Sequence, residues 1–218
     1  MTSRHVILSC LVLSCAAAFA GVAHADGEPW GLAQLMRRFH AVTSSQAHFV
    51  ERRYLGMLSE PLKSSGKLTY SAPDRHEKIT LTPQPERLSL DGDRLTIDRG
   101  LGDRGLGDRG SGDRGSGDRG SGGRRQTLAL SAHPEIAGVV ESIRGTLAGD
   151  PDALERFYTV SLTGDEHAWT LRLDPKDTTL RKLVSRITIA GSGAAIHTID
   201  TREGDGDHTE MIILDDPQ

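Results

Sequence analysis

Apolar and polar residues alternate along most of this chain, and the alternation predicts a protein built mainly from β-strands. The alternating runs in the first part of the chain cover residues 47–56, 66–73, 76–83, 86–93, 94–98 and 124–130. Later runs cover residues 158–164, 168–175, 185–191, 194–200 and 208–216. A period of two places alternate side chains on opposite faces of a strand. Asp91-Gly92 separates two of the runs and is a strong signal for a tight turn between them.

Two segments have the apolar spacing of a helix instead. In residues 30–39 the apolar positions are Trp30, Leu32, Leu35, Met36 and Phe39. In residues 134–148 an apolar stripe begins after Pro134 and is followed by Gly149, as expected at the two ends of a helix. Residues 151–158 add a helical turn or two. Because strands do not alternate with helices, the pattern favours an antiparallel sheet with a few covering helices over a parallel, nucleotide-binding sheet.

The first residues have the composition of an export signal. Arg4 and His5 precede the apolar run "VILSCLVLSCAAAFAGVA", and Ala23-His24-Ala25 forms a small-x-small cleavage site. We therefore expect residues 1–25 to be a signal peptide cleaved after Ala25, and residues 26–218 to form a single domain in a bacterial periplasm. The alternatives are an uncleaved membrane anchor, for which the run is short, and lipoprotein cleavage at Cys15, for which Leu13 fits poorly.

Charge and cysteine content narrow the classes of protein further. Both cysteines, Cys10 and Cys15, lie in the predicted signal, so the exported chain would form no disulfide. The formal net charge of −4 argues against nucleic acid as a partner. No later stretch is apolar enough to span a membrane.

Residues 100–120 repeat a five-residue unit, "GLGDRGLGDRGSGDRGSGDRG". Each unit matches the G-x-G-x-x-G fingerprint of dinucleotide-binding loops, but no helix follows to face a phosphate. The period does not fit the nine-residue calcium repeat, and the equal numbers of Asp and Arg do not fit an RNA-binding tract. We interpret the repeat as an insertion, at about residues 98–125, into the tip of an ordinary β-hairpin, where added length costs little.

The sequence contains no recognisable catalytic or metal-binding motif. Its nine histidines are scattered singly, without the paired spacing of a zinc site. Three carboxylates, Glu51, Glu77 and Glu86, could act as an acid or a base. Nothing in the sequence distinguishes them from any other carboxylate. We expect no catalytic residue, no metal and no cofactor, and hence a binding protein rather than an enzyme.

Several phrases in this order resemble the LolA-type outer-membrane lipoprotein carriers. They are "SSQAHFVERR", "GKLTYSAPDRHEK" and "ERLSLDGDRLTI", followed by two helices and C-terminal strands. The most specific combination is Ala47, Phe49, Gly66, Leu68, Tyr70, Pro73 and Asp91-Gly92-Asp93. The phrases "LAGDPDALERFY" and "DGDHTEMII" are typical of the divergent LolA-related branch.

This resemblance implies an α+β fold, an incomplete antiparallel β-barrel of about ten strands with helices forming a lid over an apolar cavity. Acyl chains would lie in that cavity, shielded from water. The candidate lining residues are Phe49, Leu68, Tyr70, Ile79, Leu88, Leu95, Trp169 and Leu171. The implied partners are a lipid or lipoprotein cargo, an inner-membrane donor protein and an outer-membrane acceptor protein, and we expect a monomer.

One position departs from the lipoprotein carriers. In that family an arginine precedes the proline of the second strand and helps to hold the lid closed, whereas here Ala72 precedes Pro73. Arg75 is the nearest possible substitute. The departure admits a cargo of other lipids or lipid-linked metabolites.

Three functional hypotheses follow. The first is a periplasmic carrier that ferries lipids or lipoproteins toward the outer membrane. The second is a periplasmic sensor or interaction domain of the same fold that acts in envelope signalling. The third is an envelope enzyme, to which no residue in the sequence points.

Overall fold

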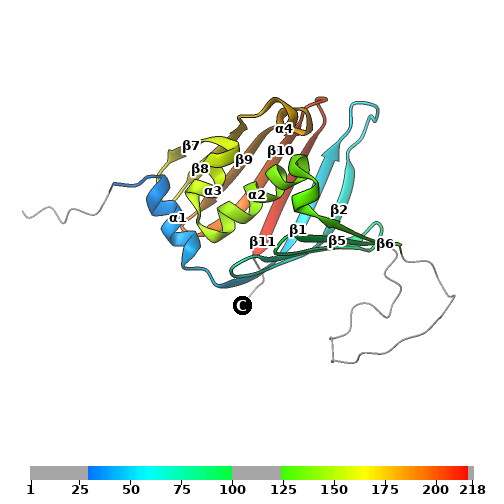
Figure 1. Ribbon diagram of the computed structural model, residues 1–218, viewed down its shortest axis with the longest axis horizontal. Coiled ribbons are helices and arrows are strands. Elements are labelled where there is room, and N and C mark those ends of the chain that lie inside the picture. The colour runs from blue at the N-terminus through cyan, green and yellow to red at the C-terminus, as the bar shows by residue number, and fades with distance from the viewer. Residues whose placement is uncertain (1–28, 100–123, 216–218) are drawn as a thin grey trace, which may run out of the picture.

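Eleven β-strands form one antiparallel sheet in the computed structural model, which describes residues 29–99 and 124–215 (Figure 1). The predicted signal peptide and the whole Gly-Asp-Arg repeat lie outside the described residues. The strands of the first half are β1 (Ser44–Tyr54), β2 (Leu62–Ser71), β3 (Arg75–Thr82), β4 (Glu86–Asp91), β5 (Arg94–Arg99) and β6 (Arg124–Ala129). Those of the second half are β7 (Tyr158–Gly164), β8 (Trp169–Pro175), β9 (Val184–Ser192), β10 (Ala195–Glu203) and β11 (His208–Asp215).

The order of the strands is β6-β5-β4-β3-β2-β1-β11-β10-β9-β8-β7. Each half is a meander in which consecutive strands pair, and the two meanders meet where β1 pairs with β11. The edges β6 and β7 do not pair with each other, so the sheet stays open. This confirms the incomplete antiparallel barrel with helices that the sequence predicts.

Helices cover one face of this sheet (Figure 1). They are α1 (Leu32–His40), α2 (Pro134–Ala148), α3 (Pro151–Phe157) and α4 (Thr178–Leu183), with a short 3-10 helix at Leu130–Ala132. The observed ends of α2 agree with its sequence signals, because Gly149 follows it in the left-handed conformation, with φ of 65°. A side chain there would also clash, since a Cβ would lie 2.1 Å from the carbonyl oxygen of Met36.

The sequence pattern did not predict α4. Its six residues are too few to show an apolar stripe, and the helix is defined mainly by its N-cap. The Asp177 carboxylate accepts hydrogen bonds from the backbone N–H of Thr179 at 2.7 Å and of Leu180 at 3.1 Å.

The strands on either side of the repeat form a hairpin. Asp98 pairs with Arg125, and Arg99 at the end of β5 pairs with Arg124 at the start of β6. Arg99 and Arg124, which flank the segment outside the described residues, therefore lie directly opposite each other.

The largest apolar core lies between the helices and the second half of the sheet. It combines buried residues of α1, α3 and α4 with those of β7–β9, and its fully buried members include Leu35, Leu154, Leu171 and Leu173. The rings of Phe39 and Trp169 meet edge to face, with centroids 5.7 Å apart. Among the helices of the described segments, none is both long and apolar enough to cross a bilayer.

We expect the stability of the domain to depend strongly on this core. Leu173 is 0 % exposed, so Leu173→Ala should lower the free energy of unfolding by about 2–5 kcal/mol, through lost burial and the cavity left behind. Leu214 of β11 lies on the face of the sheet away from the helices and is 48 % exposed. Leu214→Ala should therefore lower the free energy of unfolding by less than about 1 kcal/mol. Urea denaturation measures both, and equal losses would contradict this assignment of the core.

Candidate functional site

The face of the sheet that the helices cover, here called the inner face, carries seven of the eight predicted lining residues. The cross-strand register places them there, because residues directly opposite each other share a face. Phe49 and Leu68 lie at its centre, and Trp169 and Leu171 lie in the second half of the sheet. The remaining three, toward the β6 edge, are Tyr70, Leu88 and Leu95. Their contact with a ligand stays a prediction.

Ile79 lies on the opposite, outer face, so its prediction as a lining residue is wrong. It pairs with Lys67 of β2 and Arg87 of β4, whereas its neighbour Lys78 pairs with Leu68 and Leu88 on the inner face. Hydrophobicity alone assigned Ile79 to the wrong face, because β3 places the charged Lys78 on the inner face. A shift of one residue in register exchanges the two faces of a strand.

Near the β6 edge, a second and smaller apolar cluster lies beneath α2. Leu90 and Leu95 of the sheet pack with Leu130 and with Val140 of α2. Leu88 is partly buried against them. The inner face is thus covered at two places, by the large core on one side and by this small cluster on the other.

An ion pair lies on the inner face between the two apolar clusters. The ammonium of Lys78 is 2.5 Å from the Glu51 carboxylate and 4.9 Å from the centroid of the Phe49 ring. The Ser64 hydroxyl donates to the same carboxylate at 3.2 Å. The Lys78 and Glu51 side chains are 28 % and 17 % exposed, so this partly exposed pair interrupts the apolar surface.

The other two candidate carboxylates also form ion pairs. Glu77 contacts Arg87 at 3.3 Å, and Glu86 contacts Arg99 at 2.5 Å. Together with the pairing of Glu51, this gives all three acid or base candidates a structural partner.

A polar contact fastens α2 to the sheet. Arg144 of α2 donates a 2.6 Å hydrogen bond to the carbonyl oxygen of Gly92, in the tight turn between β4 and β5, and contacts Glu141 at 3.0 Å. Gly92 has φ of 56°, as the predicted turn at Asp91-Gly92 requires. Helix α2 therefore carries the arginine, and the turn of the sheet supplies the acceptor.

Neither residue considered at the family arginine position makes this contact. Ala72 is exposed and donates its backbone N–H to Thr43 at 2.8 Å. Arg75 pairs with Asp91 at 3.2 Å on the outer face. Sequence reasoning missed Arg144 because nothing in the helical pattern distinguishes it from a solvated arginine.

His76 lies on the inner face close to this contact. Its ring stacks on Tyr70 with centroids 5.1 Å apart, and both ring nitrogens are buried without a hydrogen-bond partner among the described residues. Burial lowers the pKa of His76 below its ordinary value, the nearby Arg144 lowers it further, and Asp74 opposes the change. Burial and the nearby Arg144 therefore both favour the neutral imidazole.

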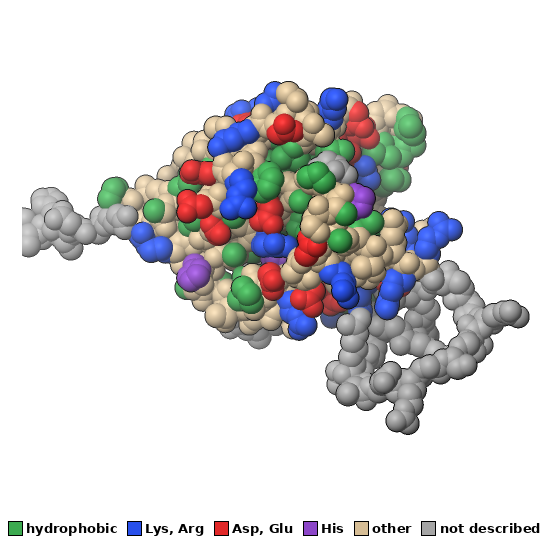
Figure 2. All heavy atoms as spheres, in the orientation of Figure 1, with side chains coloured by type: hydrophobic (Ala, Val, Ile, Leu, Met, Phe, Trp, Pro, Cys, Tyr) green, Lys and Arg blue, Asp and Glu red, His purple; other side chains and the backbone are tan. Residues whose placement is uncertain are grey.

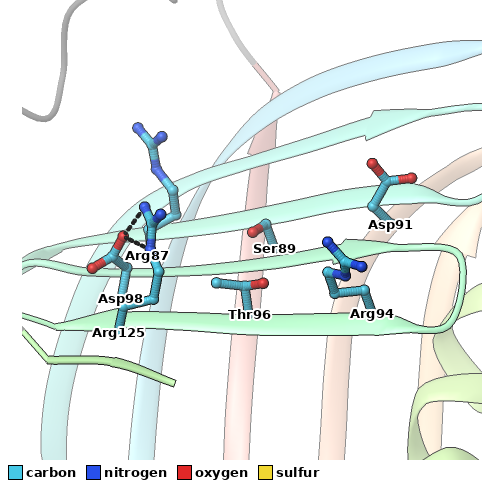
Figure 3. A pocket seen from close by; sticks show the side chains of 7 residues that line it. All are labelled: Arg87, Ser89, Asp91, Arg94, Thr96, Asp98 and Arg125. Carbon is cyan, nitrogen blue, oxygen red and sulfur yellow. Dashed lines mark hydrogen bonds and ion pairs between the residues drawn. The ribbon is translucent and has the colours of Figure 1, made fainter. Parts of the chain in front are cut away.

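Two hollows lie elsewhere on the sheet. One, of about 220 Å³, is on the outer face and is lined by Arg87, Ser89, Asp91, Arg94, Thr96, Asp98 and Arg125 (Figure 3). Its lining is polar, and Arg125 and Asp98 already bind each other at 2.6 Å. The other, of about 380 Å³, is lined by β1 and β2 residues that include the inner-face residue Tyr70.

Three carboxylates gather at the turn between β10 and β11. One oxygen atom from each of Glu203, Asp205 and Asp207 lies within 4.8 Å of the others. Two of them have other partners, because Glu203 binds Arg53 at 3.0 Å and Asp207 accepts from the Gly56 N–H at 2.8 Å. The absence of a metal stays a prediction.

Comparison with known families now adds to this geometry. The family described as outer membrane lipoprotein carrier protein LolA-like matches residues 114–215. This segment is therefore similar to the LolA-like carrier family. It holds β6–β11 and α2–α4, while the phrase around Gly66 and Tyr70 lies before it. The LolA-like resemblance read from the sequence is thus confirmed. No curated protein sequence matches the chain.

Several solved structures are similar to this chain at low identity. A chain of the Pseudomonas aeruginosa MucA/MucB complex is 16 % identical with a TM-score of 0.41, covering 84 % of this chain and 54 % of that one. A LolA superfamily protein from Nitrosomonas europaea is 8 % identical with a TM-score of 0.37, covering 86 % and 93 %. LprF from Mycobacterium bovis is 10 % identical with a TM-score of 0.30, covering 86 % and 92 %. This chain thus spans about half the length of the MucA/MucB chain that it matches.

The buried His76 makes the stability of the folded protein depend on pH. The unfolded state binds a proton near pH 6.5 while the folded state does so only at lower pH, so stability is complete above about pH 6.5 and falls below it. Between pH 7.5 and 5.5, we expect His76→Phe to remove the part of the loss in folding stability that comes from His76. Urea denaturation at both values measures it.

The matched control is His167→Phe, since the His167 side chain is 85 % exposed. That variant should keep the pH dependence of the natural protein. An unchanged pH dependence in His76→Phe would contradict the burial of a neutral His76.

Proposed function

We propose that this protein is a periplasmic carrier that binds acyl chains of lipoproteins or other lipids on its inner face and ferries them toward the outer membrane. The observation that carries the proposal is an inner face with apolar surface on both sides of the Lys78–Glu51 ion pair, covered on the β6 side by a small cluster and an arginine contact. No catalytic step is part of the proposal.

The energetics favour an acyl chain as the occupant of this face. Each CH₂ group removed from water contributes about 0.8 kcal/mol, so a long chain gains enough to displace a few side-chain contacts. The small cluster between α2 and the sheet has four buried members, which are Leu90, Leu95, Leu130 and Val140 of α2 itself. The acyl chain would replace part of that cluster rather than the large core.

Polar groups on α2 also allow the helix to move. Ser142 and Thr146 are buried, yet both hydroxyls donate within α2, to the carbonyl oxygens of Val139 and Ser142, each at 2.6 Å. Since these bonds travel with the helix, lifting α2 leaves neither of these two hydroxyls without its acceptor. Tyr158 ties α2 to β7 through a 3.0 Å bond to Gly138 and would act as the pivot.

Release of the cargo requires the same contacts to close again. The hydrogen bond between Arg144 and the Gly92 carbonyl would re-form once the acyl chain leaves. Return to the closed state would therefore need no new partner. The proposal includes membrane proteins that donate and accept the cargo. Because Ala72 stands where the carrier family has an arginine, the proposed cargo includes both lipoproteins and other lipids.

The decisive experiment is native mass spectrometry of the protein purified from a bacterial periplasm without detergent. We expect an adduct with the mass of a phospholipid, a fatty acid or a lipidated peptide. A ligand-free mass, together with no binding of a fluorescent fatty acid, would overturn the carrier proposal. The interaction-domain hypothesis would then take its place.

A pair of variants tests which face binds. Leu68 and Ile79 are both partly buried, but Leu68 lies on the inner face and Ile79 on the outer face. Leu68→Gln should weaken binding of a fluorescent fatty acid roughly tenfold, because it removes one apolar contact of about 1.5 kcal/mol. Ile79→Gln should leave the affinity unchanged, with urea denaturation confirming that both variants fold. Equal effects would contradict binding on the inner face.

A further inference from the structure

The hairpin between β1 and β2 ends in an exposed apolar tip, here defined as residues 55–62. Within it Met57 is 88 % exposed, Leu62 52 % and Leu58 43 %. Hydrophobic side chains gather at this end of the molecule, at the upper right of the space-filling view (Figure 2). Such side chains cost free energy in water, and a cluster of them on the surface commonly marks a contact site.

The tip extends beyond its neighbour β3. Residues 62–64 of β2 pair with β1, but the pairing of β2 with β3 starts only at Ser65. The apolar side chains therefore project from the end of the sheet instead of lining a groove.

The tip is also held in a fixed conformation. Leu58 donates its N–H to the Leu55 carbonyl at 2.9 Å, closing a turn. The Gly56 N–H donates to Asp207 at 2.8 Å, and Arg53 binds Glu203, so the neighbouring β10–β11 turn supports the tip. The apolar residues are exposed by a built turn and not by fraying of the hairpin.

Charges of both signs flank the tip on separate sides, and the exposed Glu60 lies within it. On one side, Arg52 and Lys63 lie directly opposite each other, both exposed. On the other side, the adjoining turn carries Glu203, Asp205 and Asp207. A phosphatidylethanolamine or phosphatidylcholine headgroup offers both a phosphate and an ammonium, and so complements both sets of charges.

We propose that this tip inserts into the surface of a zwitterionic lipid bilayer and docks the protein there. Met57, Leu58 and Leu62 would enter the boundary between headgroups and acyl chains, with Arg52 and Lys63 at the level of the phosphates. A lipid surface needs no complementary pocket, which suits a projecting tip. The contact lies outside the inner face and does not depend on the proposed carrier function.

The predicted absence of cysteine from the exported chain permits a direct test. Met57→Cys and, as the matched control, Leu214→Cys are labelled with an environment-sensitive fluorophore, after a mass measurement has located the N-terminus of the periplasmic protein. With vesicles of phosphatidylcholine and phosphatidylethanolamine, the label at position 57 should shift to shorter wavelength and be quenched by spin-labelled lipid. The label at position 214, whose native leucine is 48 % exposed on the outer face, should not change.

Vesicle flotation of unlabelled protein gives the second readout. The double variant Met57→Ser with Leu58→Ser should reduce the bound fraction about tenfold, while Leu214→Ser should match the natural protein. A water-like emission at position 57 with these vesicles would overturn the proposal, and so would binding that survives the double variant or requires anionic lipid. These assays use no cargo, so their failure is distinct from a failure to find an acyl ligand.

Discussion

The pairing of β1 with β11 holds this fold together. Ala47–Tyr54 of β1 lie opposite His208–Asp215 of β11, and this ladder alone joins the two meanders within the sheet. Each meander can form from local hairpins, but the joining ladder links the two ends of the domain and has to close a long stretch of chain. The same strand carries Phe49 and Glu51 to the centre of the inner face and ends at the exposed tip. Support for the lid and the position of the tip thus both depend on one ladder.

Much of the fold can be predicted from the sequence because its signals are local. The alternating runs coincide with the strands, and Pro134 and Gly149 mark the ends of α2, since each of these features acts through a few neighbouring residues. The site is harder to predict because it depends on register. In β3 the apolar residue Ile79 faces outward and Lys78 inward, which follows from pairing with Leu68 and not from the composition of the strand. Arg144 gains its role only when α2 meets the turn at Gly92, which lies far away in the sequence.

The inner face is not a uniform apolar surface. Lys78 and Glu51 form an ion pair between a large core on one side and a small cluster on the other. Charges at such a position are costly without partners, but here they have each other, Ser64 and the face of the Phe49 ring. A molecule occupying this face would meet apolar surface on both sides and a polar point between them. That pattern suits an amphiphile better than a plain hydrocarbon, in agreement with a lipid that has a polar group.

Within the described residues, the open sheet has two edge strands, β6 and β7. Edge strands invite pairing with the edge of another copy, which leads to fibres or aggregates. The edge strand β6 begins with Arg124 and Arg125, both exposed, and all of its residues except Leu128 are exposed. Two copies meeting through β6 would bring the arginines of both into one ladder and bury no apolar face in return. The exposed arginines thus disfavour pairing of β6 with the same edge of another copy.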